Sequence, residues 1–566
     1  MMVNPVKTDQ KNSFRLLAGF ICCWVLLNSL QALFTGIYPD EAYYWVYSLN
    51  LQWGYFDHPP VVALGIKIGE LLGHNGFFTR LGTILFSAGS VFFLWKAIPP
   101  KLVDTKSFLI IFLSVIPFHV YGFIATPDGA LFFFTAMFFF AYRLYLRQES
   151  FRNCFFITVA IIGMLYSKYH AVLPLALVFF SNPKLIFKTS SWAVVFIVVL
   201  ALSPHIYWQY THGWPTIYYH LSDRIGSQYR ISKTLYYLLG QLLMWGPLAT
   251  IPVFYKFIKP STSDLYLKAH RYTFWGVLIF FLLNSFRSSI EMHWTLVAGV
   301  SFVVLLMQVL HNTSATFRNT IFKLAFLNIF LVLVLRVFLI IPGSPLSRAS
   351  NFKSMFYGKA LLDGVYKYAG DTPVVFIDSY ALPSLYKYYH PNVQTIGYNT
   401  INYRRNHFTI SNDEILLNNK KAFVELDHKI DNSDVFVTSP YTNIYLHPID
   451  SFKAVNALKI QWLNPEKKGK PGEEKQALLS ITNTSSERIV ADTSLGLSYT
   501  FFKTRKDKQT SRNKLLGWQF EPGEKISARL NLKMPEEKGN YRLIFSFEYY
   551  PFQGTLASDY FDVRIE

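Results

Sequence analysis

Apolar runs long enough to cross a bilayer, about 17–25 residues, recur along the chain up to residue 342. They lie at 14–35, 77–97, 107–125, 129–146, 152–166, 170–182, 191–208, 235–258, 272–286, 293–310 and 319–341. Ser167-Lys168-Tyr169-His170 interrupts the stretch 152–182, which is therefore either two short spans or one re-entrant element. The pattern predicts a polytopic α-helical membrane domain over residues 1–342, with about eleven transmembrane helices.

The loops between these runs alternate in character. Short loops that carry Lys or Arg, as cytoplasmic loops usually do, lie at 98–106, 147–151, 183–190, 259–271 and 311–318. The opposite set gathers most of the conspicuous polar motifs and lies at 36–76, 126–128, 167–170, 209–234 and 287–292. With the N-terminus in the cytoplasm, this second set and the tail after residue 342 both fall on the outer face.

The first outer loop, 36–76, contains shorter amphipathic segments. Residues 61–73 are too few to cross a bilayer, and their apolar positions recur with helical spacing around Lys67 and Glu70. This spacing predicts a helix that lies in the plane of the membrane interface. We expect a second such helix near 42–51.

The tail changes from mixed to all-β patterning. Strand-like runs at 373–377 and 434–437 accompany helical runs at 381–389 and 413–419, which predicts a small α/β domain over residues 343–454. From 455 to 566, short alternating apolar and polar segments are separated by turn clusters such as Glu521-Pro522-Gly523-Glu524. This spacing predicts a C-terminal β-sandwich of immunoglobulin-like character.

Composition narrows the class of protein. Of the 566 residues, 51% are hydrophobic and 16% are charged, whereas about 25% are charged in a typical soluble domain. Much of the net charge of +19 lies in short loops, where it sets topology, so we expect no nucleic-acid partner. The three cysteines supply neither a disulfide framework nor a CxxC zinc site. No glycine-rich phosphate-binding motif follows a strand, so we expect no nucleotide cofactor.

The stretch from Ile37 to Pro60 places acidic residues beside the membrane, where they are costly and usually functional. Asp40 and Glu41 stand among tyrosines that would partly desolvate them. A group transfer to a hydroxyl needs a general base, and such a carboxylate suits that role. The pair would equally serve as the N-terminal cap of the helix near 42–51. Spacing alone leaves both interpretations open.

Tyr55-Phe56-Asp57-His58-Pro59-Pro60 is the second motif of this loop. Asp57 with His58 suits a divalent cation or a hydrogen-bonded phosphate. The alternative is a rigid turn in which Asp57 only caps the helix that follows.

Further polar groups belong to the other outer loops. Thr126-Pro127-Asp128-Gly129 places a carboxylate at the outer end of a span, although these residues also make good turn chemistry. Positive or hydrogen-bonding groups follow at Lys168, His170, His205, His212, His220, Arg224, Arg287 and His293. A phosphate leaving group needs such donors, whereas a single Lys or Arg at a span end is commonly a snorkelling side chain.

These motifs resemble the GT-C type glycosyltransferases of glycosyltransferase family 39, which take a sugar from a polyprenyl-phosphate carrier. That family includes protein O-mannosyltransferases and the bacterial lipid A aminoarabinose transferase. The matching stretches are Asp40-Glu41 with Tyr44, Tyr55 to Pro60, Pro127-Asp128, Ser167-Lys168 with Pro174, His212 to Pro215, and His293-Trp294. The resemblance covers residues 14–341.

The resemblance implies an integral membrane enzyme that transfers a single sugar from this lipid carrier, with inversion and without a covalent intermediate. The acceptor would be a hydroxyl or phosphate of a protein, lipid A or a glycan. Asp40 would be the general base, and Glu41 and Asp128 are further catalytic candidates. The candidates for binding the donor phosphate are Lys168, His220, Arg224, Arg287 and His58.

The resemblance also bears on metal and location. Asp57 is the candidate ligand of a divalent metal cation, because relatives associate the acidic position before the paired prolines with metal or phosphate. Asp-His stands here where Glu-Lys is common, which weakens that inference. The tail is not the sugar-binding repeat domain of eukaryotic mannosyltransferases. This points to a bacterial inner membrane, with the active site and tail on the periplasmic side.

Other classes of protein stay open. A lipid-linked sugar flippase or transporter would line a polar path with Asp40, Asp128 and Lys168, although the paired halves typical of transporters are not visible. A structural or assembly protein would explain the β-rich tail but not the clustered polar loops.

Overall fold

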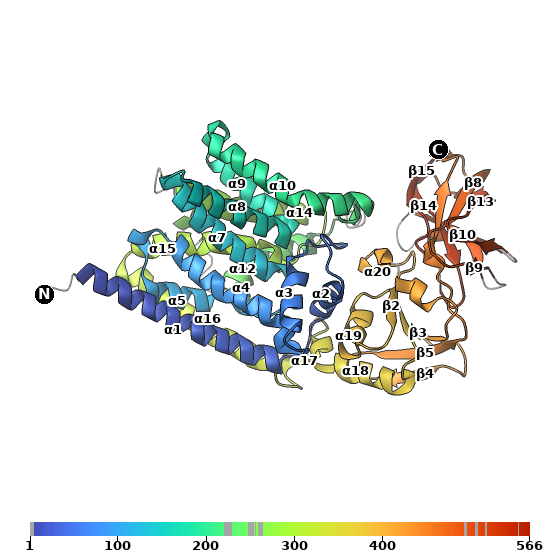
Figure 1. Cartoon of the computed structure of the whole chain (residues 1–566), viewed down its shortest axis with the longest axis horizontal. Helices are drawn as coiled ribbons and strands as arrows, with labels where there is room; N and C mark the ends of the chain where they lie inside the picture. Colours follow the sequence, from blue (N-terminus) through green and yellow to red (C-terminus); the bar gives the residue numbers. More distant parts are fainter. Residues whose placement is uncertain are drawn as a thin grey trace. The chain divides into compact units, whose positions relative to one another are not determined.

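The computed structural model of the protein describes residues 5–219, 229–246, 254, 256–257, 264–411, 413–491, 495–503, 508–514, 518–552 and 554–566. The chain divides into two compact units, Met1–Phe356 and Tyr357–Glu566. The first unit is helical and the second is built mainly from strands (Figure 1).

Among the described residues, six helical segments are long and apolar enough to cross a membrane. They belong to α1 (Pro5–Phe34), α4 (Gly76–Ala97), α7 (Pro127–Arg147), α10 (Thr189–Thr211), η5 with α15 (Met292–Ala298 and Gly299–His311) and α16 (Ala315–Phe338). The other apolar runs contain α5 (Thr105–Ser114), α6 (Ile116–Val120), α8 (Phe151–Ser167), α9 (Val172–Ser181), α12 (Ile231–Trp245) and α14 (Leu265–Ser285). The prediction of a polytopic helical domain is confirmed in this coarser form.

The predicted run 107–125 is not a single helix. α5 ends at Ser114 and α6 begins at Ile116, with Val115 in an extended conformation between them. Pro117 has no N–H to donate, so it can stand in the first turn of α6 but cannot continue α5. A non-helical stretch, 121–126, then leads to α7.

The amphipathic segments of the first outer loop are both helices, α2 (Pro39–Leu49) and α3 (Val61–Glu70). α3 packs on α4. Its Val62 and Ile66 are buried, whereas Leu64 and Ile68 are exposed. An exposed apolar stripe is what an interfacial helix requires, and the location of α3 at a membrane interface stays a prediction.

Some contacts join segments at or beside loops that were predicted to share a face, and the alternation of faces itself stays a prediction. Among the predicted cytoplasmic loops, Lys188 and Ser190 both donate to Glu149, and the Tyr266 hydroxyl donates to the Ala97 carbonyl at 2.7 Å. The predicted outer loops contact one another at the site described below.

The second unit begins with a mixed sheet whose strand order is β2-β1-β3-β5-β4. These strands are β1 (Val374–Ile377), β2 (Thr395–Tyr398), β3 (Ala422–Leu426), β4 (Val435–Thr438) and β5 (Asn443–Ile449). β1 is parallel to β2 and β3, whereas β5 is antiparallel to β3 and β4. The helices in this region are α18 (Lys353–Ala369), α19 (Ala381–Tyr389), α20 (His407–Ile410) and the 3-10 helix η6 (Asp413–Leu417).

From residue 458 the described elements are strands arranged in further sheets. Their orders are β11-β10-β14-β15-β7, β13-β8-β6 and β12-β9. The strands are β6 (Leu458–Trp462), β7 (Lys468–Gly469), β8 (Glu474–Asn483), β9 (Ile489–Val490), β10 (Gly496–Phe502), β11 (Lys508–Lys514), β12 (Gln519–Phe520), β13 (Lys525–Lys533), β14 (Gly539–Glu548) and β15 (Phe561–Ile565). Alternate residues of β8, β10, β13 and β14 enter one hydrophobic core. The predicted β-rich C-terminal region is confirmed.

Candidate active site

Asp128 and Lys168 form a buried ion pair in the helical unit. Lys168 lies just after α8 in an extended conformation, and its Nζ donates to both carboxylate oxygens of Asp128 at 2.9 Å. Both side chains are 6% exposed, and His293 Nε2 lies 3.8 Å from Asp128 Oδ2. The ion pair thereby joins the predicted outer turns at 126–128 and 167–170. His293, which directly follows the predicted turn at 287–292, lies close to Asp128.

Asp40 belongs to the same cluster. It lies in the first turn of α2 and is partly exposed. Asp40, Asp128 and Glu291 all interact electrostatically with Tyr121, which follows α6. Carboxylates from three separate segments therefore act on one tyrosine.

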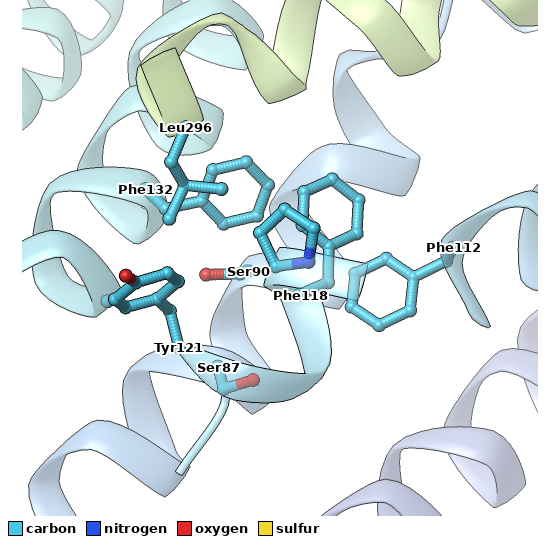
Figure 2. Close-up of a pocket in the computed structure, with 9 residues that line it drawn as sticks. Ser87, Ser90, Phe112, Phe118, Tyr121, Phe132 and Leu296 are labelled. Carbon is cyan, nitrogen blue, oxygen red and sulfur yellow. The ribbon is translucent and has the colours of Figure 1, made fainter. Parts of the chain in front are cut away.

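A small cavity lies beside this cluster. Its volume is about 10 Å³, which is room for about one water molecule. Figure 2 shows Tyr121, Phe132 and Leu296 around it, with Ser87 and Ser90. The cavity is too small and too apolar to hold a sugar.

Glu41 is engaged in a closed ion pair with Arg80. Arg80 Nε donates to Oε1 at 2.7 Å and Nη2 donates to Oε2 at 2.5 Å. The backbone N–H groups of Ala125 and Tyr38 donate to the same carboxylate. Both ion-paired side chains are 0% exposed, so Glu41 is presented to no substrate.

Arg80 also forms hydrogen bonds to the backbone at the end of α1 and just after it. Its guanidinium also donates to the carbonyls of Ala32, Thr35 and Gly36, at 3.0, 2.7 and 2.8 Å. These carbonyls have no partner within α1 because a helix leaves its last carbonyls unpaired. The Glu41–Arg80 pair therefore fixes the start of α2, on which Asp40 stands.

Asp57 accepts a hydrogen bond from the Tyr47 hydroxyl. Burial, and then the neighbouring Asp57 carboxylate, raise the pKa of Tyr47 well above its ordinary value. Tyr55 stacks on Tyr47 with 4.2 Å between ring centroids, and burial raises the pKa of Tyr55 to about 12. Both tyrosines keep their protons at neutral pH, so Tyr47 is a permanent donor to Asp57.

A polar network holds the loop around Asp57 against other segments. His205 contacts the Trp53 carbonyl at 2.6 Å and the Tyr169 hydroxyl at 3.1 Å. Thr216 donates to the Phe56 carbonyl at 2.9 Å and accepts from Gln209 at 2.8 Å. The first outer loop is thus anchored to α10 and to the segments 167–170 and 209–218.

The candidate phosphate-binding residues are less closely gathered. The His58 ring packs against Tyr44, with 5.4 Å between centroids. Arg287 is exposed just after α14. His220 and Arg224 lie outside the described residues.

The surroundings of Asp57 do not fit a divalent metal cation well. Its hydrogen-bond partner Tyr47 is a phenol that keeps its proton, and hard cations prefer carboxylate and carbonyl oxygens. In the part of the chain that the structure describes, the group arranged like metal ligands lies in the second unit and comprises Asp431, Asp434 and His447. His447 Nδ1 there lies 2.7 Å from Asp434 Oδ1.

Sequence reasoning missed two important residues. Arg80 lies inside the run 77–97, whose other basic residue, Lys96, is at its far end, and an arginine within a span is itself a signal of a functional or paired charge. Tyr121 carries no such signal, since the chain contains 36 tyrosines. Only the folded arrangement distinguishes it.

Part of the chain is similar to known proteins. The family model described as dolichyl-phosphate-mannose-protein mannosyltransferase matches residues 57–208. The lipid A galacturonosyltransferase RgtD of Rhizobium johnstonii is 24% identical over 271 residues, which are 45% of this chain and 56% of that protein. The match thus spans little more than half the length of this relative.

Solved structures show the same fold. Crystal structures of ArnT from Cupriavidus metallidurans match in the apo state and bound to undecaprenyl phosphate, with TM-scores of 0.57 and 0.54. Each is 12% identical and covers 76% of this chain, and the matches cover 98% and 97% of the respective ArnT chains.

Proposed function

We propose that this chain, which resembles the GT-C type glycosyltransferases, transfers a single sugar from a polyprenyl-phosphate carrier to an acceptor. The observation that carries the proposal is that the partly exposed Asp40 and the Asp128–Lys168 pair both act electrostatically on Tyr121, although they come from separate segments. ArnT, which shares the fold, binds undecaprenyl phosphate, and we propose a carrier of this kind here.

Asp40 is the proposed general base. It is partly exposed, whereas Glu41 and Asp128 are buried in ion pairs with Arg80 and Lys168. Asp40 would take the proton of the acceptor hydroxyl as that oxygen bonds to the anomeric carbon. The bond from this carbon to the phosphate oxygen breaks at the same time, so the configuration inverts and polyprenyl phosphate leaves.

The buried pairs have positioning roles in this proposal. Glu41 and Arg80 fix the start of α2 and hence Asp40. Lys168 holds Asp128, whose carboxylate is also approached by His293. The more accessible His58 and Arg287 are proposed to bind the donor phosphate with His220 and Arg224, because phosphate favours charge-assisted donors.

The finer architecture belongs to the same proposal. We propose that the eleven apolar runs all cross a bacterial inner membrane, with the site and the second unit on the periplasmic side. The C-terminal sheets, which share one core, would form a sandwich. The acceptor is a protein, lipid A or a glycan, and the lipid A relative makes lipid A the first to test.

The test is a transfer assay with the purified chain in liposomes. The donor is polyprenyl phosphate carrying a labelled sugar, and the acceptors are fractions of the bacterial envelope. A transferase releases polyprenyl phosphate and labels one acceptor fraction. A flippase instead moves the intact donor across the bilayer, so accumulation of intact donor in the opposite leaflet without bond cleavage would refute the proposal.

Mass spectrometry of envelope glycans and glycoproteins from a deletion strain complements this assay. Loss of a single sugar would name the donor and the acceptor class together.

A further inference from the structure

Arg336 is a buried cation of the helical unit that the reaction as proposed above does not use. It lies two residues before the end of α16, in a segment apolar enough to cross a membrane, and is 4% exposed. Within the described ranges no carboxylate forms an ion pair with it. A charge in such a place is costly and is usually functional, so Arg336 needs an explanation other than an ion pair.

The contacts of Arg336 converge on the segment that leads from α6 to α7. Its Nη2 donates to the carbonyl of His119 in α6 at 3.3 Å and to Asn28 Oδ1 on α1. Its guanidinium lies 5.6 Å from the ring centroid of Phe123 and 5.5 Å from that of Trp24. One side chain of α16 therefore contacts the end of α6, the segment that follows it and α1.

Arg80 on α4 contacts the same segment. Its guanidinium lies 5.4 Å from the ring centroid of Phe123, and its ion-pair partner Glu41 accepts from the backbone N–H of Ala125 at 2.8 Å. Phe123 is 0% exposed. Cations from two separate helices thus contact one buried ring, and residues 119–125 are held at three points.

Close packing leaves this segment little freedom. A Cβ at Gly122 would lie only 2.5 Å from the carbonyl oxygen of Phe118 and 3.2 Å from the Trp24 ring. The Trp24 ring also meets that of His119 edge-on, with 4.9 Å between centroids. Because neighbouring groups are packed this tightly, loss of Arg336 should shift the backbone of 119–125 and not one side chain alone.

We infer that Arg336 is a positioning residue for sugar transfer, which acts through the segment 119–125. This segment runs into the first turn of α7, where Asp128 stands, and its Ala125 binds Glu41, the neighbour of Asp40. The inference rests on the proposed function, because that reaction is what gives these carboxylates their roles. Arg336 itself is buried and touches no substrate.

The test compares two buried arginines in the full chain, reconstituted in liposomes. Arg143 donates to the carbonyl of Ile98 at 2.5 Å and lies 5.7 Å from the ring centroid of Phe140. It stands on α7 at the end opposite to Asp128, about 22 Å away along the helix. Arg143→Met is therefore the matched control for Arg336→Met.

We expect both variants to lower the unfolding temperature to a similar extent. Only Arg336→Met should slow transfer, by about 10- to 100-fold in kcat, because a misplacement of about 1 Å at a reacting group can cost roughly 100-fold. The KM for the donor should change by less than about twofold, since Arg336 makes no contact with it.

Two milder variants serve if Arg336→Met does not fold. Arg336→Lys keeps the charge but loses the planar group, so we expect transfer to slow by about threefold to tenfold. Phe123→Leu removes the ring that the guanidinium contacts. If Arg336 acts through this ring, the double variant should transfer no more slowly than the slower single variant.

The outcomes separate the two claims. If the wild-type chain transfers no sugar, the proposed function fails and this inference with it. If the wild type transfers sugar but Arg336→Met is equally fast, or Arg143→Met loses as much activity, Arg336 has no positioning role and the proposed function stands. Additive losses in the double variant would contradict action through Phe123.

Discussion

In the helical unit, the buried carboxylates Glu41 and Asp128 each contact a cationic side chain. In the second unit, the buried carboxylates Glu414 and Glu425 form no ion pair with any described residue, and burial raises the pKa of each to about 7. Glu41 and Asp128 are thus kept charged by pairing, whereas Glu414 and Glu425 tend to be neutralised by protonation.

This difference indicates that the paired carboxylates of the helical unit have a functional role, whereas the unpaired carboxylates of the second unit do not need one. A buried ion pair gains little stability over an apolar pair of the same shape, so its presence needs another reason. Here both pairs are linked to Asp40. The Glu41–Arg80 pair fixes the start of α2, and Asp128 acts electrostatically on Tyr121, as Asp40 does. Glu414 and Glu425 in the second unit position no other residue in this way. We therefore expect that glutamine can replace either of them without loss of stability.

The largest expected effect comes from breaking the closed pair. Arg80→Met leaves Glu41 buried without its cation and removes three bonds to the end of α1. We expect a loss of about 3–5 kcal/mol in the free energy of unfolding, measured by denaturation of the protein in detergent. Exposed Lys359, paired with Asp363 on α18, supplies the control, since Lys359→Met should cost at most about 1 kcal/mol. Equal costs for both variants would contradict the assigned role of Arg80.

Variants of the Asp128–Lys168 pair should separate the effect on stability from the effect on activity. Lys168→Met alone leaves Asp128 buried and unpaired, whereas the double variant with Asp128→Asn removes both charges. We expect the double variant to recover most of the lost stability but to stay roughly 100-fold slower in sugar transfer, the order of one lost electrostatic contribution to catalysis. Thermal unfolding and transfer rates on the same samples decide this. Recovery of activity together with stability would make the pair purely structural.

In the second unit, Glu414 makes stability depend on pH. Its pKa is raised to about 7 by burial, against a hydrogen bond from Asn456 at 2.8 Å. The folded state therefore keeps a proton that the unfolded state loses above its ordinary pKa, so stability falls as pH rises from about 4.5 to 7.

Glu414→Gln should remove this contribution and stabilise the unit at pH 8 by roughly 1–3 kcal/mol. Pulse proteolysis of the full chain at pH 5 and pH 8, read out on fragments of residues 357–566, measures it. An unchanged slope against pH in the variant would show that Glu414 is not the titrating group.

The smallest expected effect on activity comes from removing divalent metal cations or substituting Asp57. Asp57 is held by a tyrosine hydroxyl, and within the described ranges it belongs to no group of three or more His, Cys, Asp or Glu side chains arranged like metal ligands. We expect a chelator to leave sugar transfer unchanged. Asp57→Asn, which keeps an acceptor for Tyr47, should cost less than about tenfold. Loss of activity on chelation, restored by a divalent cation, would return the metal to the mechanism.

Much of the fold could be predicted from periodicity. The helices α2 and α3 and the strands β1 and β4 appear where the pattern places them, and most of the apolar runs contain helices. The break at Val115 could not be expected from hydropathy, because Ile116-Pro117-Phe118 is as apolar as its neighbours and only the missing N–H of Pro117 ends the helix there.

The site was less predictable than the fold. Asp128 and Lys168 could be assigned to one face, but their mutual pairing depends on how α7 and α8 pack. Asp40 and Glu41 are adjacent in sequence, and spacing could not say that Arg80 would take one of them and leave the other partly exposed. The contact between Glu41 and Arg80, which are 39 positions apart in the sequence, determines which of the two acids is buried.

Single-turnover sugar transfer by Asp40→Asn tests the central claim most directly. The protein is reconstituted in liposomes with its polyprenyl-phosphate donor, and binding of polyprenyl phosphate is measured on the same preparation. Glu149→Gln, an exposed carboxylate paired with Lys188, is the matched control. The account predicts that Asp40→Asn binds the lipid normally and transfers sugar about 100- to 10,000-fold more slowly, while Glu149→Gln is unchanged. Transfer by Asp40→Asn within a few-fold of the wild-type rate would contradict Asp40 as the base.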